Sequence, residues 1–252
     1  MNERRERIKD YIYQNGDVKV SKLIEIFPEV TPMTIRRDLT YLEEQKVILR
    51  SHGSARKPDF LSPLSEDLYI NRESINSSSK DIIAQKAEAF VEERRSLFLD
   101  SGTTIMSLVK RIPDHKLTIF TTGPNIGMEI ARTTTKPQIT LLGGNLSRNT
   151  FSTSGYSCLD AIHSINIDVA FIVPSAYSLN FGFSVGNQYE CEVKRAILKK
   201  AQTRILLIDS SKFDKNMPYT FATMADIDYF ISDDKVPTEI QEEAAQHHVT
   251  IL

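Results

Sequence analysis

Seven short apolar runs recur along the last two thirds of the chain, and stretches with helical periodicity separate them. Near-continuous runs of Val, Ile and Leu are typical of parallel strands that are covered on both faces. The pattern predicts an α/β domain built on a mostly parallel sheet. The runs are SLFLD (96–100), LTIFT (117–121), ITLLG (139–143), DVAFIV (168–173), RILLID (204–209), DYFIS (228–232) and HVTIL (248–252).

The first 56 residues follow a different pattern, of short helices. Residues 3–15 have helical periodicity, and a short extended piece then leads to a second helix, for which Ser21 is the expected N-cap. A third helix is expected to begin at Pro32, because proline is tolerated at the first helical position and Thr31 is a good N-cap. VILRSHG (47–53) then has strand character and ends at a glycine. Three short helices and a small β-ribbon predict a winged helix-turn-helix.

The two patterns predict two domains joined by a linker. We expect a winged helix-turn-helix over residues 1–56, a connecting segment with one short helix over residues 57–79, and a larger α/β domain over residues 80–252. Residues 1–56 hold 11 Lys and Arg against 9 Asp and Glu, which leaves 20 against 24 for the rest of a chain whose net charge is −2. This mild asymmetry favours different partners for the two parts.

Composition is that of an ordinary globular protein, with 40% hydrophobic and 25% charged residues. No apolar run approaches the roughly 18 residues that a membrane span needs. The charged start, MNERRERIKD, has no apolar signal-peptide core. Cys158 and Cys191 are too few for a disulfide framework and lack the spacing of metal ligands. We therefore expect a cytoplasmic protein with reduced thiols, no membrane partner, and no metal or cofactor.

The third predicted helix carries candidate DNA contacts. Its apolar residues recur at i, i+4 and i+7 from Ile35 and form a stripe that we expect to be buried. Arg36 and Arg37 lie on the opposite face, where arginine can contact guanine or phosphate in the major groove. A solvated helix face is the alternative interpretation, and helical spacing alone does not decide between them. The candidate DNA contacts are Thr31, Met33, Thr34, Arg36, Arg37 and Thr40 on this helix, with Arg50 and His52 on the wing.

The motif TIRRDLTYLEEQKVILRSHG (34–53) closely resembles the N-terminal signature of the DeoR family of bacterial transcriptional regulators. Similar pieces continue to the C-terminus: KDIIAQKAEAFV, LDSGTT, LLGG, ECEVKRAIL and IDSSKF. Two departures are visible, because the turn FPEVTPMT is one residue longer than usual and the wing ends HGSA instead of His-Gly-Gly-Ala. The resemblance implies an effector domain with the fold of ribose-5-phosphate isomerases. In many members of the DeoR family this domain senses phosphorylated sugars.

A phosphate site is expected at LDSGTT (99–104), after the first apolar run. Gly102 allows close approach of the backbone, the flanking hydroxyl groups can donate hydrogen bonds, and a helix start adds partial positive charge. An ordinary strand-to-helix turn is the alternative, but DSSK (209–212) at a second strand end favours a ligand site. Lys80 and Lys212 are the cations that the resemblance implies.

Other candidates for this site keep two interpretations. Asp100 can accept a hydrogen bond from a sugar hydroxyl or cap its own turn, and Glu190 and Lys194 are spaced for a plain surface ion pair. Thr122 stands where the family usually has asparagine. The full candidate set for the effector is Lys80, Asp100, Ser101, Gly102, Thr103, Thr104, Thr121, Thr122, Gly143, Gly144, Glu190, Lys194 and Lys212.

An active sugar-phosphate isomerase fused to a DNA-binding module is the rival hypothesis. Isomerisation needs a positioned carboxylate base, and the isomerases carry an acidic loop after a core strand. Here that strand leads into VPSAYSLNFGFS (173–184), which has no carboxylate, although Glu190 or Glu192 can match a later glutamate. A domain that only oligomerises is a third possibility. The sequence favours a non-enzymatic repressor of a sugar-catabolism operon. Its expected partners are double-stranded operator DNA, a phosphorylated sugar and further copies of itself, as a dimer or tetramer.

Overall fold

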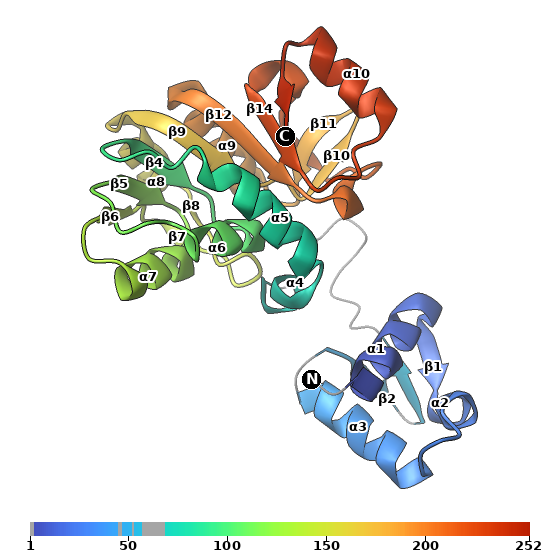
Figure 1. The fold of residues 1–252 in the computed structure, drawn as a ribbon. Coiled ribbons are helices and arrows are strands. Elements are labelled where there is room, and N and C mark those ends of the chain that lie inside the picture. The colour runs from blue at the N-terminus through green and yellow to red at the C-terminus, as the bar shows by residue number, and fades with distance from the viewer. Residues whose placement is uncertain (1–2, 45–46, 52, 57–68) are drawn as a thin grey trace. The chain divides into compact units, whose positions relative to one another are not determined.

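The computed structural model describes residues 3–44, 47–51, 53–56 and 69–252, and the chain divides into two compact units, Met1–Ser62 and Pro63–Leu252 (Figure 1). His52, one of the predicted DNA contacts, lies outside the described residues. Among the described residues, no helix is both long enough and apolar enough to cross a bilayer.

The N-terminal unit is the predicted winged helix-turn-helix. Its strands pair antiparallel in the order β1-β3-β2. The second helix begins directly after β1 with Lys19 as N-cap and no side-chain cap, so the expected cap at Ser21 is wrong. Thr31 does cap the third helix, because its Oγ1 accepts a hydrogen bond from the Thr34 N–H at 3.3 Å. The elements are α1 (Glu3–Asn15), β1 (Asp17–Lys19), α2 (Val20–Ile26), α3 (Pro32–Glu44), β2 (Leu49–Ser51) and β3 (Ser54–Arg56).

A small apolar core holds these elements together. The predicted stripe on α3 is fully buried, and residues from α1, α2 and the β-ribbon pack against it. Burial of one face leaves the other face of α3 exposed to solvent, as the helical periodicity predicts. The buried core residues are Ile8, Ile12, Val18, Leu23, Phe27, Ile35, Leu39, Leu42, Ile48 and Ala55.

The C-terminal unit is built on a seven-stranded sheet in the order β15-β14-β12-β9-β4-β5-β6. Each of the seven apolar runs supplies one strand, and all neighbouring strands pair in parallel. The predicted parallel α/β architecture is therefore confirmed. The strands are β4 (Ser96–Leu99), β5 (Thr118–Thr121), β6 (Gln138–Leu141), β9 (Ile167–Ile172), β12 (Ala201–Ile208), β14 (Tyr229–Ser232) and β15 (Thr250–Ile251).

Helices cover both faces of this sheet (Figure 1). Alternate residues of each strand enter two separate cores: in β12, Ile205 and Leu207 face one core, and Leu206 and Ile208 face the other. The first core lies under α5 (Ser77–Glu88), α6 (Thr103–Val109) and α7 (Pro124–Thr133). The second lies under α8 (Tyr156–His163), α9 (Gln188–Lys200) and α10 (Thr238–Gln246). Burial on both faces explains why the strands have continuous apolar runs.

The order in which the strands are added to the sheet reverses beside β4. The chain runs outward from β4 through β5 to β6 and returns through the hairpin of β7 (Asn145–Leu146) and β8 (Thr153–Ser154) to β9, on the other side of β4. Loops that leave β4 and β9 in opposite directions open a crevice at the carboxyl ends of the strands.

Two features differ from the sequence expectations. An antiparallel sheet of β10 (Ala176–Ser178), β11 (Gly182–Val185) and β13 (Tyr219–Ala222) was not predicted. Residues 69–79, assigned to the linker, lie in the C-terminal unit, where α4 (Tyr69–Ser74) is the short helix that was expected and α5 already begins at Ser77. The Tyr69 N–H donates to the Asn149 carbonyl at 2.7 Å, so α4 is fastened to this unit.

Candidate DNA-binding surface and effector site

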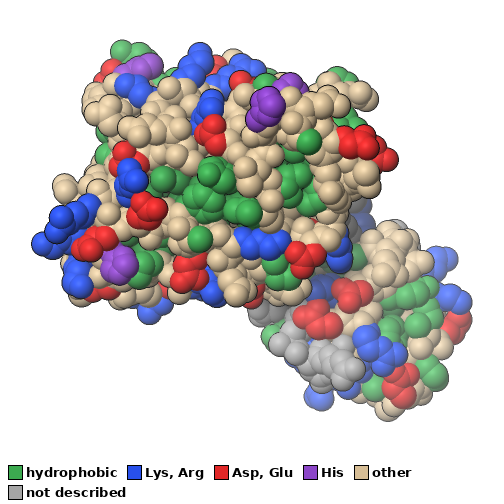
Figure 2. Space-filling model, turned by 45° about the horizontal axis from the view of Figure 1, so that its top comes forward, with side chains coloured by type: hydrophobic (Ala, Val, Ile, Leu, Met, Phe, Trp, Pro, Cys, Tyr) green, Lys and Arg blue, Asp and Glu red, His purple; other side chains and the backbone are tan. Residues whose placement is uncertain are grey.

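The exposed face of α3 presents the side chains that the sequence assigned to DNA. Met33 is 63% exposed, Arg36 and Arg37 are exposed, and the apolar stripe on the opposite face has no exposed surface. Two arginines beside an apolar side chain can contact guanine, phosphate and a thymine methyl group. On the C-terminal unit, the visible face has acidic and basic side chains interspersed (Figure 2).

Asp38 fixes α3 against α1. Its side chain is 2% exposed, and its two oxygens accept hydrogen bonds from Arg4 Nε at 2.6 Å and Arg5 Nε at 2.8 Å. Burial alone would raise the pKa of Asp38, but the two arginines lower the pKa below its usual value. Asp38 therefore positions α3 against α1, and its two arginine partners could not be identified from the sequence.

Arg50 on β2 packs against α3. Its Nη1 donates to Thr40 Oγ1 at 2.9 Å and lies 3.6 Å from a Glu43 carboxylate oxygen. Thr40 Oγ1 in turn donates to the Arg36 carbonyl at 3.0 Å. The wing strand and the exposed face of α3 therefore form one continuous polar surface, on which the arginine of the wing is held by the helix.

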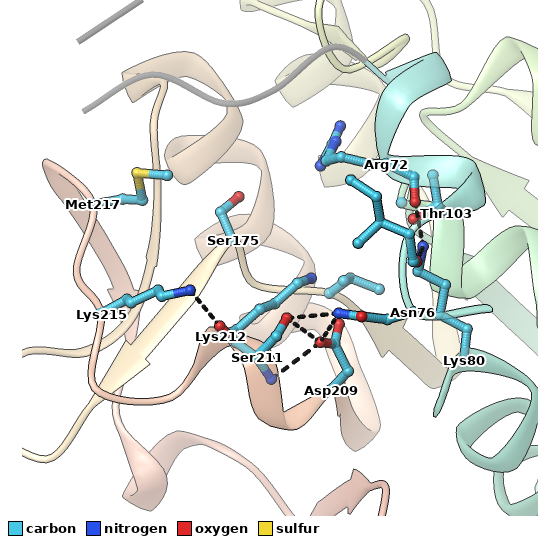
Figure 3. Close-up of a pocket in the computed structure, with 13 residues that line it drawn as sticks. Arg72, Asn76, Lys80, Thr103, Ser175, Asp209, Ser211, Lys212, Lys215 and Met217 are labelled. Carbon is cyan, nitrogen blue, oxygen red and sulfur yellow. Dashed lines mark hydrogen bonds between the residues drawn. The ribbon is translucent and has the colours of Figure 1, made fainter. Parts of the chain in front are cut away.

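The second site is a cavity of about 220 Å³ at the carboxyl ends of the central strands (Figure 3). Its walls come from the loops after β4, β9 and β12 and from the segment that joins α4 to α5. It therefore lies at the reversal point of the sheet, where parallel α/β sheets bind ligands. The lining residues are Arg72, Ile75, Asn76, Lys80, Gly102, Thr103, Val173, Ser175, Asp209, Ser211, Lys212, Lys215 and Met217.

Three lysines bring positive charge to this cavity. The ammonium of Lys80 donates to the carbonyls of Arg72 and Ile75, that of Lys212 to the Pro174 carbonyl at 2.8 Å, and that of Lys215 to the Ser211 carbonyl at 2.6 Å. Burial, and then the charge of Lys212, lower the pKa of Lys80 to about 8. The lowered pKa shows that the positive charges in the cavity repel one another, so a bound anion would be attracted to them.

Asn76 connects the two sides of the cavity. It lies between α4 and α5 with a left-handed backbone, at φ 55°, and its amide donates to Asp209 Oδ1 at 3.1 Å and to Ser211 Oγ at 2.9 Å (Figure 3). Burial alone would raise the pKa of Asp209, but Lys212 and the hydrogen bonds from Ser211 and Asn76 lower that pKa. The asparagine thereby ties the start of α5 to the loop after β12.

Asp100 and Lys194 lie beneath the cavity. The Asp100 carboxylate accepts hydrogen bonds from the Ser101 N–H at 2.8 Å, the Val173 N–H at 2.9 Å and the Lys194 ammonium. Lys194 also donates to the Val173 carbonyl at 3.0 Å and lies 3.3 Å from Glu190. The ion pair considered for Glu190 and Lys194 does form, but it is buried and not on the surface, since the relative exposures of these two residues are 9% and 2%. The group joins the loops after β4 and β9.

Four of the thirteen predicted effector residues line the cavity, and nine do not. Ser101, Thr104, Thr121 and Thr122 are buried, and the Thr121 hydroxyl accepts the Gly123 N–H at 3.0 Å. Gly144 has φ +130°, and a Cβ there would lie 2.2 Å from the Ser154 carbonyl oxygen, so this glycine serves backbone packing. The four that line the cavity are Lys80, Gly102, Thr103 and Lys212, and the nine that do not are Asp100, Ser101, Thr104, Thr121, Thr122, Gly143, Gly144, Glu190 and Lys194.

Sequence reasoning missed other lining residues. Asp209 and Ser211 belong to the strand-end motif DSSK and had a usable signal. Arg72 and Asn76 had none, because they lie in a segment rich in Ser and Asn that the sequence assigned to the linker. Lys215 follows the motif by three residues, where a lysine is ordinarily solvated.

Comparisons with known proteins agree with this two-part arrangement. Residues 4–59 match the model of the DeoR-like helix-turn-helix domain, and residues 75–234 match that of the DeoR C-terminal sensor domain. The chain therefore belongs to the DeoR family. It is a DNA-binding transcriptional regulator rather than an enzyme, in agreement with the names of its relatives.

Two relatives from Escherichia coli align over almost their whole length. The putative aga operon transcriptional repressor of the O157:H7 strain is 28% identical, with 100% of this chain and 93% of that protein covered. The glycerol-3-phosphate regulon repressor of strain K12 is also 28% identical, with 99% and 97% covered. Among solved structures, ribose 5-phosphate isomerase A from Neisseria gonorrhoeae matches with a TM-score of 0.39 and 17% identity, over 53% of this chain and 52% of that one.

Proposed function

We propose that this protein represses a sugar-catabolism operon and that a phosphorylated sugar in the cavity controls its affinity for the operator. One observation carries the proposal: Lys80, Lys212 and Lys215 surround a cavity at the ligand-binding position of a parallel sheet. A phosphate dianion offers the negative charge and the acceptor oxygens that lysine ammonium groups bind.

The names of two relatives support repression, and one of them also supports a phosphorylated effector. One is named for glycerol-3-phosphate and the other for the aga operon, and both are named as repressors. In this proposal residues 1–56 bind the operator, in the cytoplasm, and residues 80–252 bind the effector and associate with further copies of the chain. A symmetric dimer or tetramer would present paired α3 helices to repeated or palindromic half-sites.

In this proposal, effector binding is coupled to DNA binding through the cavity wall formed by α4 and the start of α5. Arg72, Asn76 and Lys80 line the cavity and follow residues 57–68, the stretch that joins the two units in sequence. An effector that contacts these side chains with different affinity in two arrangements of the chain shifts the balance between those arrangements. The free energy of operator binding then changes by the coupling free energy between the two sites. We expect the effector to release the repressor from the operator.

The test combines thermal shift with operator binding. A panel of sugar and polyol phosphates is added to the full-length protein, since a ligand that binds only the folded state raises the melting temperature by mass action. The expected result is a rise with one class of phosphorylated sugar and a matching loss of operator binding. No shift with any member would favour a domain that only oligomerises, and conversion of a panel member on prolonged incubation would revive the isomerase hypothesis.

A further inference from the structure

Unpartnered polar atoms gather near the first helix of the C-terminal unit. Among the described residues, six buried side-chain nitrogen or oxygen atoms have no hydrogen-bond partner. Five of the six belong to Tyr69, Arg72, Thr104 and Asn125, and the sixth is the hydroxyl of Ser178. Roughly 90% or more of buried polar groups in proteins are hydrogen-bonded, so a local concentration of unpartnered atoms marks a place where a ligand or ordered water can bind.

These residues lie on neighbouring elements. Tyr69 and Arg72 are three residues apart on α4 and share a face of the helix. Burial and then the charge of Glu73 raise the pKa of Tyr69 to about 12. A hydrogen-bonding interaction with the side chain of Asn125, near the start of α7, opposes that rise, although the pair does not reach full hydrogen-bond geometry. Thr104 follows the cavity-lining Thr103 on α6, against which α4 packs.

The Tyr69 side chain is held firmly in this position. It is 4% exposed, its N–H donates to the Asn149 carbonyl at 2.7 Å, and its ring stacks on Phe151 with centroids 5.2 Å apart. The hydroxyl therefore cannot turn into solvent without breaking the stack. An unpartnered phenol in such a place costs free energy in the unliganded protein, and a ligand that pairs with it recovers that cost.

Arg72 connects this group to the cavity. Its side chain lines the cavity together with the lysines and extends from α4 toward the side on which Ser175 lies (Figure 3). Its Nε is among the unpartnered atoms. Tyr69 lies one helical turn before Arg72 on α4, next to the cavity wall rather than on it.

We propose that the effector site extends past Arg72 to Tyr69 and Asn125, which bind a hydroxyl group of the effector while the lysines bind its phosphate. This inference rests on the proposed function and specifies the ligand further. The phenol can donate or accept one hydrogen bond, and the amide supplies both a donor and an acceptor. Such a pair suits the hydroxyl of a sugar or polyol and leaves a bare phosphate without this second contact.

Isothermal titration of the full-length protein tests the inference. Tyr69→Phe removes the hydroxyl and keeps the ring on Phe151, and Asn125→Ala removes the amide. Ser178→Ala is the matched control, because it removes the remaining unpartnered hydroxyl, on β10, outside the proposed extension. The probes are inorganic phosphate and the sugar or polyol phosphate of the panel that binds the wild type most tightly. A melting temperature within the wild-type range or above it shows that each variant folds.

The expected result is selective. Tyr69→Phe and Asn125→Ala each weaken binding of the sugar phosphate by about tenfold or more, because a buried partner is lost. The dissociation constants of the same variants for inorganic phosphate should lie within about twofold of the wild-type value. Those of Ser178→Ala should lie within about twofold for both probes.

Two outcomes overturn the inference in different ways. If the wild type binds a sugar phosphate and both variants bind it equally well, the effector does not reach Tyr69 and Asn125, and the unpartnered atoms bind ordered water. The proposed function then survives. If the wild type binds neither inorganic phosphate nor any panel member, the proposed function fails and this inference fails with it.

Discussion

The Lys194 ammonium on α9 donates to the Asp100 carboxylate at the end of β4, and the two side chains are only 2% and 4% exposed. The same carboxylate accepts the N–H groups of Ser101 and Val173, which begin the loops after β4 and β9. A buried ion pair with this many hydrogen bonds compensates for the loss of water around both charges. It also holds two walls of the cavity at a fixed separation.

Lys194→Met should therefore destabilise the protein strongly. Removing the ammonium leaves the buried Asp100 without its cation, and loss of one partner of a buried pair costs about 3–5 kcal/mol. Denaturant unfolding measures this change. Adding Asp100→Asn to Lys194→Met should recover part of the loss, since the more deeply buried of the two carboxylates beside Lys194 then carries no charge. A loss below about 1 kcal/mol in the single variant would show that the pair is solvated and does not support the cavity.

Asp38→Asn should loosen the contact between α3 and α1 and cost about 1–3 kcal/mol, the range for hydrogen bonds to charged groups. The pH dependence has a definite sign. Because its pKa in the folded protein lies below that of the unfolded chain, Asp38 contributes stability above about pH 4 that is lost as the pH falls through the folded value. The difference in unfolding free energy between wild type and variant should therefore shrink in acid. A difference that is independent of pH would contradict this account.

Much of the fold was predictable, because the evidence for it is local in the sequence. Each of the seven strands is a continuous apolar run, and the buried stripe on α3 follows helical spacing. The sheet of β10, β11 and β13 was not predicted, because short strands such as β10 (Ala176–Ser178) mix aromatic and hydroxyl residues without a clear period. The prediction of Ser21 as an N-cap was wrong because the chain enters α2 directly from β1, with Lys19 as the N-cap.

The site was predictable only where a motif marked it. Gly102 and Lys212 belong to recognisable strand-end motifs, and they do line the cavity. Asp100 and Lys194 belong to equally recognisable motifs but lie beneath it, since sequence cannot distinguish a side chain that faces a ligand from one that supports the loop. Arg72 lines the cavity because a segment with the composition of a linker packs onto the C-terminal unit. Only the tertiary structure shows this packing.

Arg36→Ala and Arg37→Ala should weaken operator binding. Both side chains are exposed on the face of α3 that carries Met33. A bidentate contact with guanine is worth about 1–3 kcal/mol and its loss relaxes specificity, whereas loss of a phosphate contact lowers affinity for all sequences and reduces the salt dependence by about one charge. Operator titration at several salt concentrations separates the two roles. Arg111→Ala, an exposed arginine paired with Glu88 in the C-terminal unit, is the control. Unchanged affinity in both α3 variants would refute their assignment to DNA.

Effector affinity should depend on pH through Lys80. Burial and the charge of Lys212 lower the pKa of Lys80 to about 8, so the lysine loses its proton as the pH rises through that value. A bound phosphate dianion raises this pKa again, and binding therefore takes up a proton when Lys80 is partly deprotonated.

Affinity should be nearly constant just above pH 7, where phosphate esters are already dianions, and should fall by up to about tenfold per pH unit above pH 8. Calorimetry in buffers of different ionisation enthalpy measures the proton uptake directly. Lys80→Arg keeps its charge over this range and should remove the fall, while Lys80→Gln should bind weakly at every pH. If the wild type and Lys80→Gln showed the same affinity at each pH, Lys80 would not contact the anion.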